Sequence, residues 1–448
     1  MKIEFFNKKN NIYLFFILII SSLIKLIFIV NLDNDILNLA DQSKYIRISE
    51  YILENKHYPN QPNLYTNRVP IYPYFLFFLR SIFDSLIFVV IIQNIISCFL
   101  IILVYNLSKL VLNNLSILIT FIFSINLNVI LHANLILADF LFLSFFLFFL
   151  FFFIKFMKKK RIKDLILASI IIAVSTLIRP QTQFFPFVIF ISIFFLFGDD
   201  FLKRMKFFLI FFIIFKLITF SWEIRNYYAH GKFFFDTSKQ TNLIGYYLPH
   251  FDQYELRLNL DESKKNRRQL WKKYIIENNH QNKDFVELEK LVVKYTKDEL
   301  FKYKISTFVN VLSTGIAKNL FTPTYSDISY WYKLKKSSFS KTEGSNFFDQ
   351  FKNFLIKNNN NFHSKFLIFS IVFILISRFF EFYGFLNYFK KNFLFSIFFL
   401  LIIVYFLVLM GPIGHSKYRI PYEYFLSIYL AITIDYIFNK FFLKKKIN

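Results

Sequence analysis

The 448-residue sequence has little cysteine, little glycine and few acidic residues, and each shortage restricts what the protein can be. Its one cysteine, Cys98, excludes an intramolecular disulfide. Only eight glycines are present, and neither a P-loop nor a G-x-G-x-x-G segment occurs, which leaves little material for phosphate-cradling loops. The 29 acidic residues stand against 54 lysines and arginines, for a formal net charge of +25.

Long apolar runs are what the sequence does have. Hydrophobic residues make up 56% of it, with 68 phenylalanines, in runs such as "FLFLSFFLFFLFFFIKF". Segments that are apolar on every side need lipid or a very large core to bury them. The basic residues form clusters between the runs, such as Lys158 to Lys163, as the positive-inside rule expects of cytoplasmic loops. We therefore predict an all-α polytopic membrane protein whose partner is the lipid bilayer and not a nucleic acid.

Ten segments are long enough to cross about 30 Å of hydrocarbon at about 1.5 Å per residue. They are residues 12–31, 86–106, 114–131, 135–156, 164–179, 183–198, 207–221, 364–379, 393–410 and 420–439. With the basic N-terminus inside, the basic clusters all fall on the cytoplasmic side, as does the C-terminus. The segment Val69 to Phe83, interrupted by Pro70, Pro73 and Arg80, is expected to be a short helix at the outer surface.

This topology predicts three parts. Residues 1–221 form an N-terminal transmembrane module whose first outer loop, 32–85, carries juxtamembrane helices. Residues 222–362 form a small outer subdomain, mainly helical, because "DFVELEKLVVKYTKDELFKYKISTFVNVL" has apolar residues at helical spacing with charges between them. Residues 363–448 form a C-terminal transmembrane module.

Polar residues that are costly in a membrane collect on the outer side of this topology. Asp41 and Tyr45 lie one turn apart in the segment "NLADQSKYIRISEYILENKHY". Asp139 stands at the edge of an apolar run, where an acid is expensive unless it faces a polar cavity or a partner. The others are Arg68, His132, Arg179, Trp222, Glu223, Arg225, Asn226, His230, His415, Lys417, Tyr418 and Arg419. One arginine or tryptophan at the end of a span is usually an interfacial anchor, but this convergence indicates a site.

Carboxylates beside arginines and a histidine suit a reaction between a hydroxyl and a phosphate-linked substrate. A carboxylate can take the proton of the attacking hydroxyl. Arginines hold a phosphate leaving group through charge-assisted hydrogen bonds and stabilise the charge that it gains. A long lipid on that phosphate would explain why the site lies at a membrane surface.

The order of several short motifs resembles that of the bacterial membrane glycosyltransferases of the GT-C class, the protein mannosyltransferase and aminoarabinose transferase superfamily. The motifs are "LADQSKYIRISEYILENKHY", "NRVPIYPYFLFFL", "LILADFLFLSFF", "TLIRPQTQFFPF", "SWEIRNYYAHGKFFF" and "HSKYRIPYEYFL". The resemblance implies transfer of a sugar, with inversion, from a polyprenyl-phosphate donor to a lipid, glycan or protein acceptor. It places the protein in the cytoplasmic membrane with its active site on the extracytoplasmic side.

Roles follow from the matching motifs. The resemblance makes Asp41 the catalytic base, with Tyr45 beside it, and makes Asp139 a second catalytic carboxylate. Arg68 and Arg225, the latter with Asn226, are then candidates for the donor phosphate. The remaining substrate-binding candidates are Arg179, His415, Tyr418 and Arg419, and Lys417 stands where an arginine is common.

Gln42 follows Asp41 where many relatives have a second acid, and Asp33 with Asp35 offers a rival carboxylate pair of metal-binding type. We expect no required cofactor and no metal, although this rival pair keeps a divalent ion as an alternative. Two other functions also fit the composition. A polysaccharide polymerase or ligase would use lipid diphosphates and would not need the first-loop aspartate. A lipid-linked-sugar flippase would show charges deep in its spans and an internal repeat, and we find no clear repeat.

Overall fold

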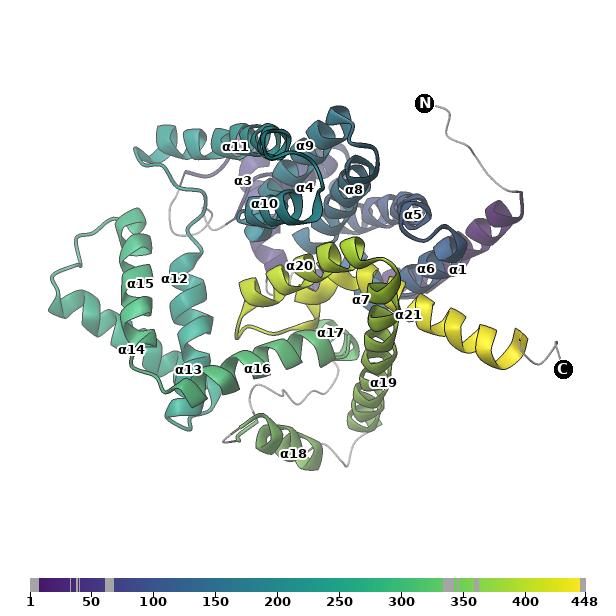
Figure 1. Cartoon of the computed structure of the whole chain (residues 1–448). Coiled ribbons are helices and arrows are strands. Elements are labelled where there is room, and N and C mark those ends of the chain that lie inside the picture. The colour runs from purple at the N-terminus through teal and green to yellow at the C-terminus, as the bar shows by residue number, and fades with distance from the viewer. Residues whose placement is uncertain are drawn as a thin grey trace.

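The structure is a computed structural model, and it describes residues 8–32, 34–37, 39, 41–60, 68–332, 342–344, 346–357 and 362–443. Every regular element within these ranges is a helix, which confirms the all-α fold class (Figure 1). Six described helices are long and apolar enough to cross a membrane: α1 (Lys8–Val30), α5 (Leu86–Val111), α8 (Ala138–Lys159), α11 (Phe201–His230), α19 (Phe362–Lys391) and α20 (Phe393–Met410). They account for six of the ten predicted spans.

The predicted span at 114–131 is broken. It consists of η1 (Asn113–Leu115), α6 (Ser116–Ser124) and α7 (Leu127–Ala133), with a bend of 56° before α7. The bend arises because the Asn126 side chain accepts hydrogen bonds from the backbone amides of Asn128 and Val129, and thereby starts a new helix. Counted as one span, this pair raises the number of candidates among the described residues to seven.

The other three predicted spans are shorter helices. They are α9 (Ile162–Ile178), α10 (Phe185–Leu196), which follows η2 (Pro180–Thr182), and α21 (Glu423–Phe438), which η6 (Asn439–Leu443) continues. Proline explains two of the early ends, since Pro180 follows α9 and Pro421 precedes α21. The count of about ten full-length spans is therefore not what the described helices give by length and composition.

The middle of the bundle is built around α8, which packs against α5 and α9. One face of α8 carries a ladder of fully buried phenylalanines, in which Phe146, Phe149 and Phe153 lie at helical spacing. Phe185 of α10 meets both Phe146 and Phe149 edge to face, with centroids 5.7 and 5.3 Å apart. Aromatic packing thus fixes α8, whose first turn carries Asp139.

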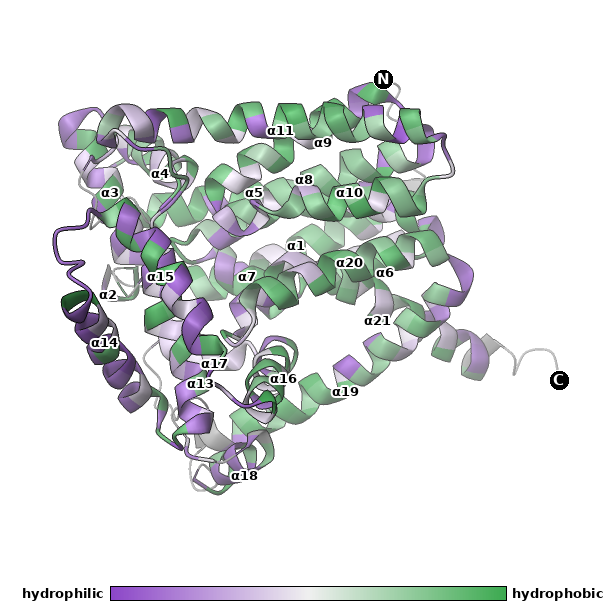
Figure 2. Ribbon diagram, turned by 60° about the vertical axis from the view of Figure 1, so that its left-hand side comes forward, coloured by the Kyte–Doolittle hydropathy of each residue, from purple (hydrophilic) through white to green (hydrophobic). Residues whose placement is uncertain are grey.

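Helices from two loop regions, several of them hydrophilic, cover one end of this bundle (Figure 2). Residues 32–85 contribute α2 (Asn34–Leu37), α3 (Asp41–Asn55) and the apolar α4 (Ile71–Ile82). From the later polar region come α12 (Lys239–Asn242), the π-helix η3 (Leu243–Tyr247), α13 (Leu248–Glu255), α14 (Leu260–Glu277), α15 (Phe285–Leu300), α16 (Ile305–Phe321), α17 (Tyr325–Trp331) and α18 (Phe347–Lys357). The start of α1 and the end of η6 lie at the opposite end of the bundle.

The outer subdomain has a core of its own. Ile244, Leu248, Trp271, Val292 and Tyr295 form a buried cluster that joins η3, α13, α14 and α15, so the predicted amphipathic helix is α15. The boundary expected between residues 221 and 222 falls inside α11, which runs on to His230, whereas the boundary expected at 362–363 coincides with the start of α19.

Candidate active site

A cavity of about 250 Å³ opens where the loop helices meet the bundle. Four distant parts of the chain supply its walls: the start of α3, the segment around the α7–α8 turn, α17, and the start of the 3-10 helix η5 (Ser416–Tyr422). Its lining residues are Asp41, His132, Leu137, Asp327, Tyr330, Trp331, His415 and Lys417. Two of the predicted site residues, Asp41 and His415, therefore face one cavity.

Asp41 is the first residue of α3, where the positive end of the helix favours a carboxylate. Arg68 Nη2 lies 2.9 Å from its Oδ1, Lys44 Nζ lies 3.3 Å from the same oxygen, and Lys417 Nζ lies 3.9 Å from Oδ2. Burial raises the pKa of the Asp41 carboxyl, but these three cations outweigh burial and hold the pKa below its ordinary value. The carboxyl is thus ionised at neutral pH while its side chain stays 40% exposed.

Tyr45 lies one turn after Asp41, as the sequence predicts, and is buried. The Arg68 guanidinium sits 5.1 Å from the centre of its ring, and the ring of Tyr72 meets it edge to face at 4.9 Å. The Tyr72 hydroxyl in turn donates a hydrogen bond to Gln93 Oε1 over 3.0 Å. This chain of contacts fixes Arg68 beside Asp41.

Asp139 and Arg179 form a buried ion pair between the first turn of α8 and the end of α9. Arg179 also interacts electrostatically with Tyr45, Tyr418 and Asp41, so it belongs to the same group. The structure thus gathers Asp41, Tyr45, Arg68, Asp139, Arg179 and Tyr418 around one place, although Asp139 is already neutralised there.

Gln42, the residue after Asp41, uses both ends of its amide side chain to hold backbone groups. Its Nε2 donates to the Ile36 carbonyl over 2.7 Å, and its Oε1 accepts from the Ile136 amide over 2.6 Å. The non-helical turn before α8 is held from the other side by Gln93, which donates to the carbonyls of Ala133 and Leu135. A carboxylate at position 42 could accept from Ile136 but could not donate to Ile36.

His132 is fully buried in the cavity wall. Its Nδ1 lies 2.8 Å from the Asn128 carbonyl oxygen, which can only accept, so Nδ1 carries the proton and donates. The tautomer is therefore fixed by the turn of α7 on which the ring sits.

Asp327 is a site residue that sequence reasoning missed. Its Oδ1 lies 3.1 Å from His415 Nε2, it is hydrogen-bonded by the Ser416 hydroxyl, and it is buried in the cavity wall. It is the one acid between Glu299 and Glu343 in the sequence, but it lies in none of the motifs quoted above. Lys417, which the sequence marks only as a departure from the usual arginine, lines the cavity with Asp41 and Asp327 and interacts electrostatically with both.

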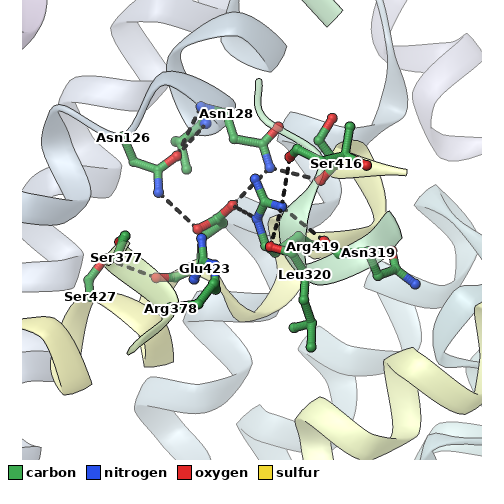
Figure 3. Close-up of polar contacts among 12 residues, drawn as sticks. Asn126, Asn128, Asn319, Leu320, Ser377, Arg378, Ser416, Arg419, Glu423 and Ser427 are labelled. Carbon is green, nitrogen blue, oxygen red and sulfur yellow. Dashed lines mark hydrogen bonds and ion pairs between the residues drawn. The ribbon is translucent and has the colours of Figure 1, made fainter. Parts of the chain in front are cut away.

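Arg419 does not face the cavity and is fully buried in a network of its own (Figure 3). Its Nε donates to Glu423 over 2.6 Å, and its Nη1 donates to the carbonyls of Asn319, Leu320 and Thr322 at the end of α16. Glu423 also accepts from Asn126 and Asn128, each over 2.9 Å. The guanidinium therefore joins α16 to η5, and through Glu423 to α21 and α7.

Arg225 and Asn226 also lie away from the cavity. Arg225 Nη2 donates to the carbonyls of Tyr58 and Pro59 and to Asn60 Oδ1, over 2.8, 3.2 and 2.6 Å. Asn226 donates to the Phe234 carbonyl over 2.9 Å. Both residues hold backbone segments against α11. Tyr58 donates to the Arg68 carbonyl over 3.0 Å, so Arg225 supports the site indirectly, through Tyr58.

One segment of the chain matches a known protein family. Residues 66–222, which include Arg68, Asp139 and Arg179, match the dolichyl-phosphate-mannose-protein mannosyltransferase family. The matched segment therefore resembles the membrane glycosyltransferases of the GT-C class. Curated proteins include no match to the sequence.

The GT-C fold extends through almost the whole chain. An oligosaccharyltransferase of Archaeoglobus fulgidus in its apo form matches with a TM-score of 0.55 and 15% identity over 97% of this chain. The same archaeal enzyme tethered to an acceptor peptide containing the NVT sequon matches with a TM-score of 0.54 and 14% identity, also over 97%. The chain spans about half the length of these solved structures, 51% in both comparisons.

Within the described ranges, no group of three or more His, Cys, Asp or Glu side chains could hold a metal ion. Asp33, one half of the rival carboxylate pair, lies outside the described residues, and Asp35 is in α2. The absence of a metal requirement stays a prediction.

Proposed function

We propose that the protein transfers a sugar from a polyprenyl-phosphate donor to an acceptor on the outer face of the cytoplasmic membrane, with inversion. The observation that carries this proposal is the placement of Asp41, an ionised carboxylate in a cavity wall with Arg68 and Lys417 beside it. A base and phosphate-binding cations within a few ångströms of one another are what a displacement at a sugar phosphate requires.

The reaction is a single displacement. Asp41 takes the proton of the acceptor nucleophile as its oxygen or nitrogen bonds to the anomeric carbon of the donor sugar. The bond between that carbon and the phosphate oxygen breaks at the same time, and the electron pair leaves with the lipid phosphate. Attack from the side opposite the leaving group inverts the anomeric configuration. Cations near the phosphate stabilise the charge that it gains.

The phosphate site that we propose consists of Arg68, Arg179 and Lys417. Arg68 and Lys417 both contact Asp41, and Arg179 interacts electrostatically with it, so all three cations act on the same carboxylate. Arg225 and Arg419 are the weaker candidates, since their guanidinium groups already donate to backbone carbonyls and, for Arg419, to Glu423. We assign Asp139 the task of holding Arg179 through its ion pair.

The outer location rests on charge and on the arrangement of the helices. The elements that line the cavity include α3, α7 and α17, which lie toward the end of the bundle covered by hydrophilic helices, and the start of α1 and the end of η6 lie at the other end (Figure 2). Basic clusters such as Lys158 to Lys163 follow α8 at its far end from Asp139. The positive-inside rule assigns that end to the cytoplasm.

Purified protein in lipid nanodiscs, supplied with synthetic polyprenyl-phosphate hexoses, tests the proposal. Release of unglycosylated lipid phosphate, dependent on an added acceptor, is the expected result. Peptide acceptors come first in the series, because one similar solved structure holds an acceptor peptide, and lipid and glycan acceptors follow. Consumption of lipid diphosphates with no use of the monophosphates would contradict the proposal and favour a polymerase or ligase. Mass spectrometry of envelope glycans from a deletion strain would then name the missing sugar.

A further inference from the structure

We infer that Asp327, His415 and Trp331 form the subsite that holds the hydroxylated sugar ring of the donor, an inference that rests on the proposed function. These residues lie across the cavity from the α7–α8 turn, on α17 and at the start of η5. Lys417 Nζ lies 3.9 Å from Asp41 Oδ2, and Lys417 lines the same cavity as Asp327. A phosphate held at Lys417 would therefore share this cavity with both the base and Asp327.

The chemistry of this wall suits a sugar ring. Asp327 offers carboxylate oxygens that accept hydrogen bonds, and the imidazole of His415, 3.1 Å from Asp327 Oδ1, can donate or accept. Trp331 and Tyr330 add aromatic surface next to these polar groups, with ring centroids 5.1 Å apart. An apolar face beside a few fixed polar groups is the usual construction of a small-molecule pocket.

Contacts of Gly414 and Ser416 with α16, α7 and Asp327 hold the subsite residues in position. A Cβ at Gly414 would lie 2.2 Å from the carbonyl oxygen of Gly315, so only glycine lets the segment before η5 approach α16 this closely. The next contacts follow directly: the Ser416 carbonyl accepts from Asn128 over 2.9 Å, and the Ser416 hydroxyl reaches Asp327. Binding groups supported in this way keep the geometry that recognition of hydroxyls needs.

The size of the cavity limits what the subsite can take. About 250 Å³ is below the range of roughly 300–1,000 Å³ that drug-sized ligands occupy. The space suits one ring directly attached to the phosphate. A ring that is joined to the phosphate through a single oxygen has to lie next to the cations, and the Asp327 wall is adjacent to Lys417.

Two kinds of probe, a lipid monophosphate with a sugar and one without, separate the sugar subsite from the phosphate site. The affinity of the purified full chain is measured for polyprenyl monophosphate and for polyprenyl-phosphate mannose and glucose, each in nanodiscs. The ratio of the two affinities isolates the contribution of the sugar. We expect Asp327→Asn, His415→Gln and Trp331→Leu each to lower this ratio about tenfold for at least one sugar, as the loss of one well-placed polar or stacking contact predicts. Binding of the monophosphate should stay within about twofold of wild type.

Matched variants make the experiment decisive. Ser326→Ala, on the same helix and outside the cavity lining, should leave the ratio unchanged. Arg179→Gln should lower the affinity for both kinds of probe by a similar factor. If Asp327→Asn unfolds, His415→Gln tests the subsite instead, because the His415 side chain is 40% exposed and its replacement disturbs packing less.

Three results would count against the inference. An unchanged ratio in His415→Gln and Trp331→Leu, with a normal unfolding temperature, would overturn it. A raised KM for the acceptor at an unchanged donor ratio would place the ring on the acceptor and so overturn the donor assignment. A wild-type protein that binds neither kind of probe would contradict the proposed function itself. That outcome differs from failure of the sugar subsite, because the protein would then not bind even the lipid monophosphate.

Discussion

Arg68 Nη2 lies 2.9 Å from Asp41 Oδ1, so the proposed base is paired with a proposed phosphate ligand before any substrate is present. The guanidinium cannot serve both anions fully. A donor phosphate at Arg68 would draw the cation away from the carboxylate, and the pKa of Asp41 would rise toward its ordinary value of about 3.9. Donor binding would thus make Asp41 a stronger base at the moment when one is needed.

The first prediction concerns Asp41 itself. Asp41→Asn keeps the size of the side chain but removes the proton acceptor, and should reduce the rate of transfer by about 10²–10⁴ with normal membrane abundance. Asp35→Asn, in the rival carboxylate pair, is the matched control and should retain most activity. Full activity in Asp41→Asn together with loss in Asp35→Asn would contradict the assignment, and activation by added divalent metal would then be the next measurement.

The second prediction is a pH profile. A carboxylate base works when it is deprotonated, so activity should fall only as pH drops through the lowered pKa of Asp41. The acid limb of kcat/KM, which reports the free enzyme, should lie at lower pH than that of kcat, which reports the donor complex. Arg68→Gln should move the limb of kcat/KM to higher pH, because a charge that lowers the pKa has gone. An acid limb that is unmoved in Arg68→Gln would show that Asp41 does not control it.

The third prediction separates positioning from phosphate binding at Arg225. Arg225→Lys keeps the positive charge but loses the planar fork that reaches two carbonyls and Asn60. We expect a several-fold lower kcat with little change in the affinity for polyprenyl monophosphate. Arg179→Lys, at the proposed phosphate site, is the comparison and should weaken that affinity. An equal loss of donor affinity in both variants would indicate that Arg225 binds the phosphate directly.

The fourth prediction concerns the network of Arg419. The pair with Glu423 is buried, and its carbonyl partners lie at the end of α16. Removing one partner, as in Arg419→Met, should destabilise the protein by about 3–5 kcal/mol, because a buried charge is left alone. The double variant Arg419→Met with Glu423→Met should be less destabilised than the single one. Thermal unfolding in detergent measures both, and a stable Arg419→Met with poor donor affinity would favour a direct role in binding.

The fifth prediction concerns topology. With Cys98 replaced by serine, single cysteines at Lys272 in α14 and at Lys159 at the end of α8 report on the two ends of the bundle, and both positions are exposed. A membrane-impermeant thiol reagent added to intact cells should label position 272 and not position 159. Labelling at position 159 would reverse the proposed orientation and place the cavity on the cytoplasmic side.

The sequence by itself determined the features that depend on local spacing and composition. Long apolar runs predicted an all-α membrane protein because only helices satisfy their own backbone hydrogen bonds in lipid. The spacing of Asp41 and Tyr45 predicted one helical face, and both residues lie in α3, which begins at Asp41. The lengths of the shorter helices were not so determined, because a polar cap such as Asn126 interrupts an apolar run without changing its composition.

The tertiary structure decided which of several chemically equal residues could act together. Arg68, Arg225 and Arg419 look alike in the sequence, and the structure separates them by whether their donors are already taken by backbone carbonyls. Asp327 became a site residue only because folding brings it to His415, far along the chain. Such contacts join segments about a hundred residues apart, and no periodic pattern extends over that distance, since local geometry relates a side chain only to its neighbours within a turn or two.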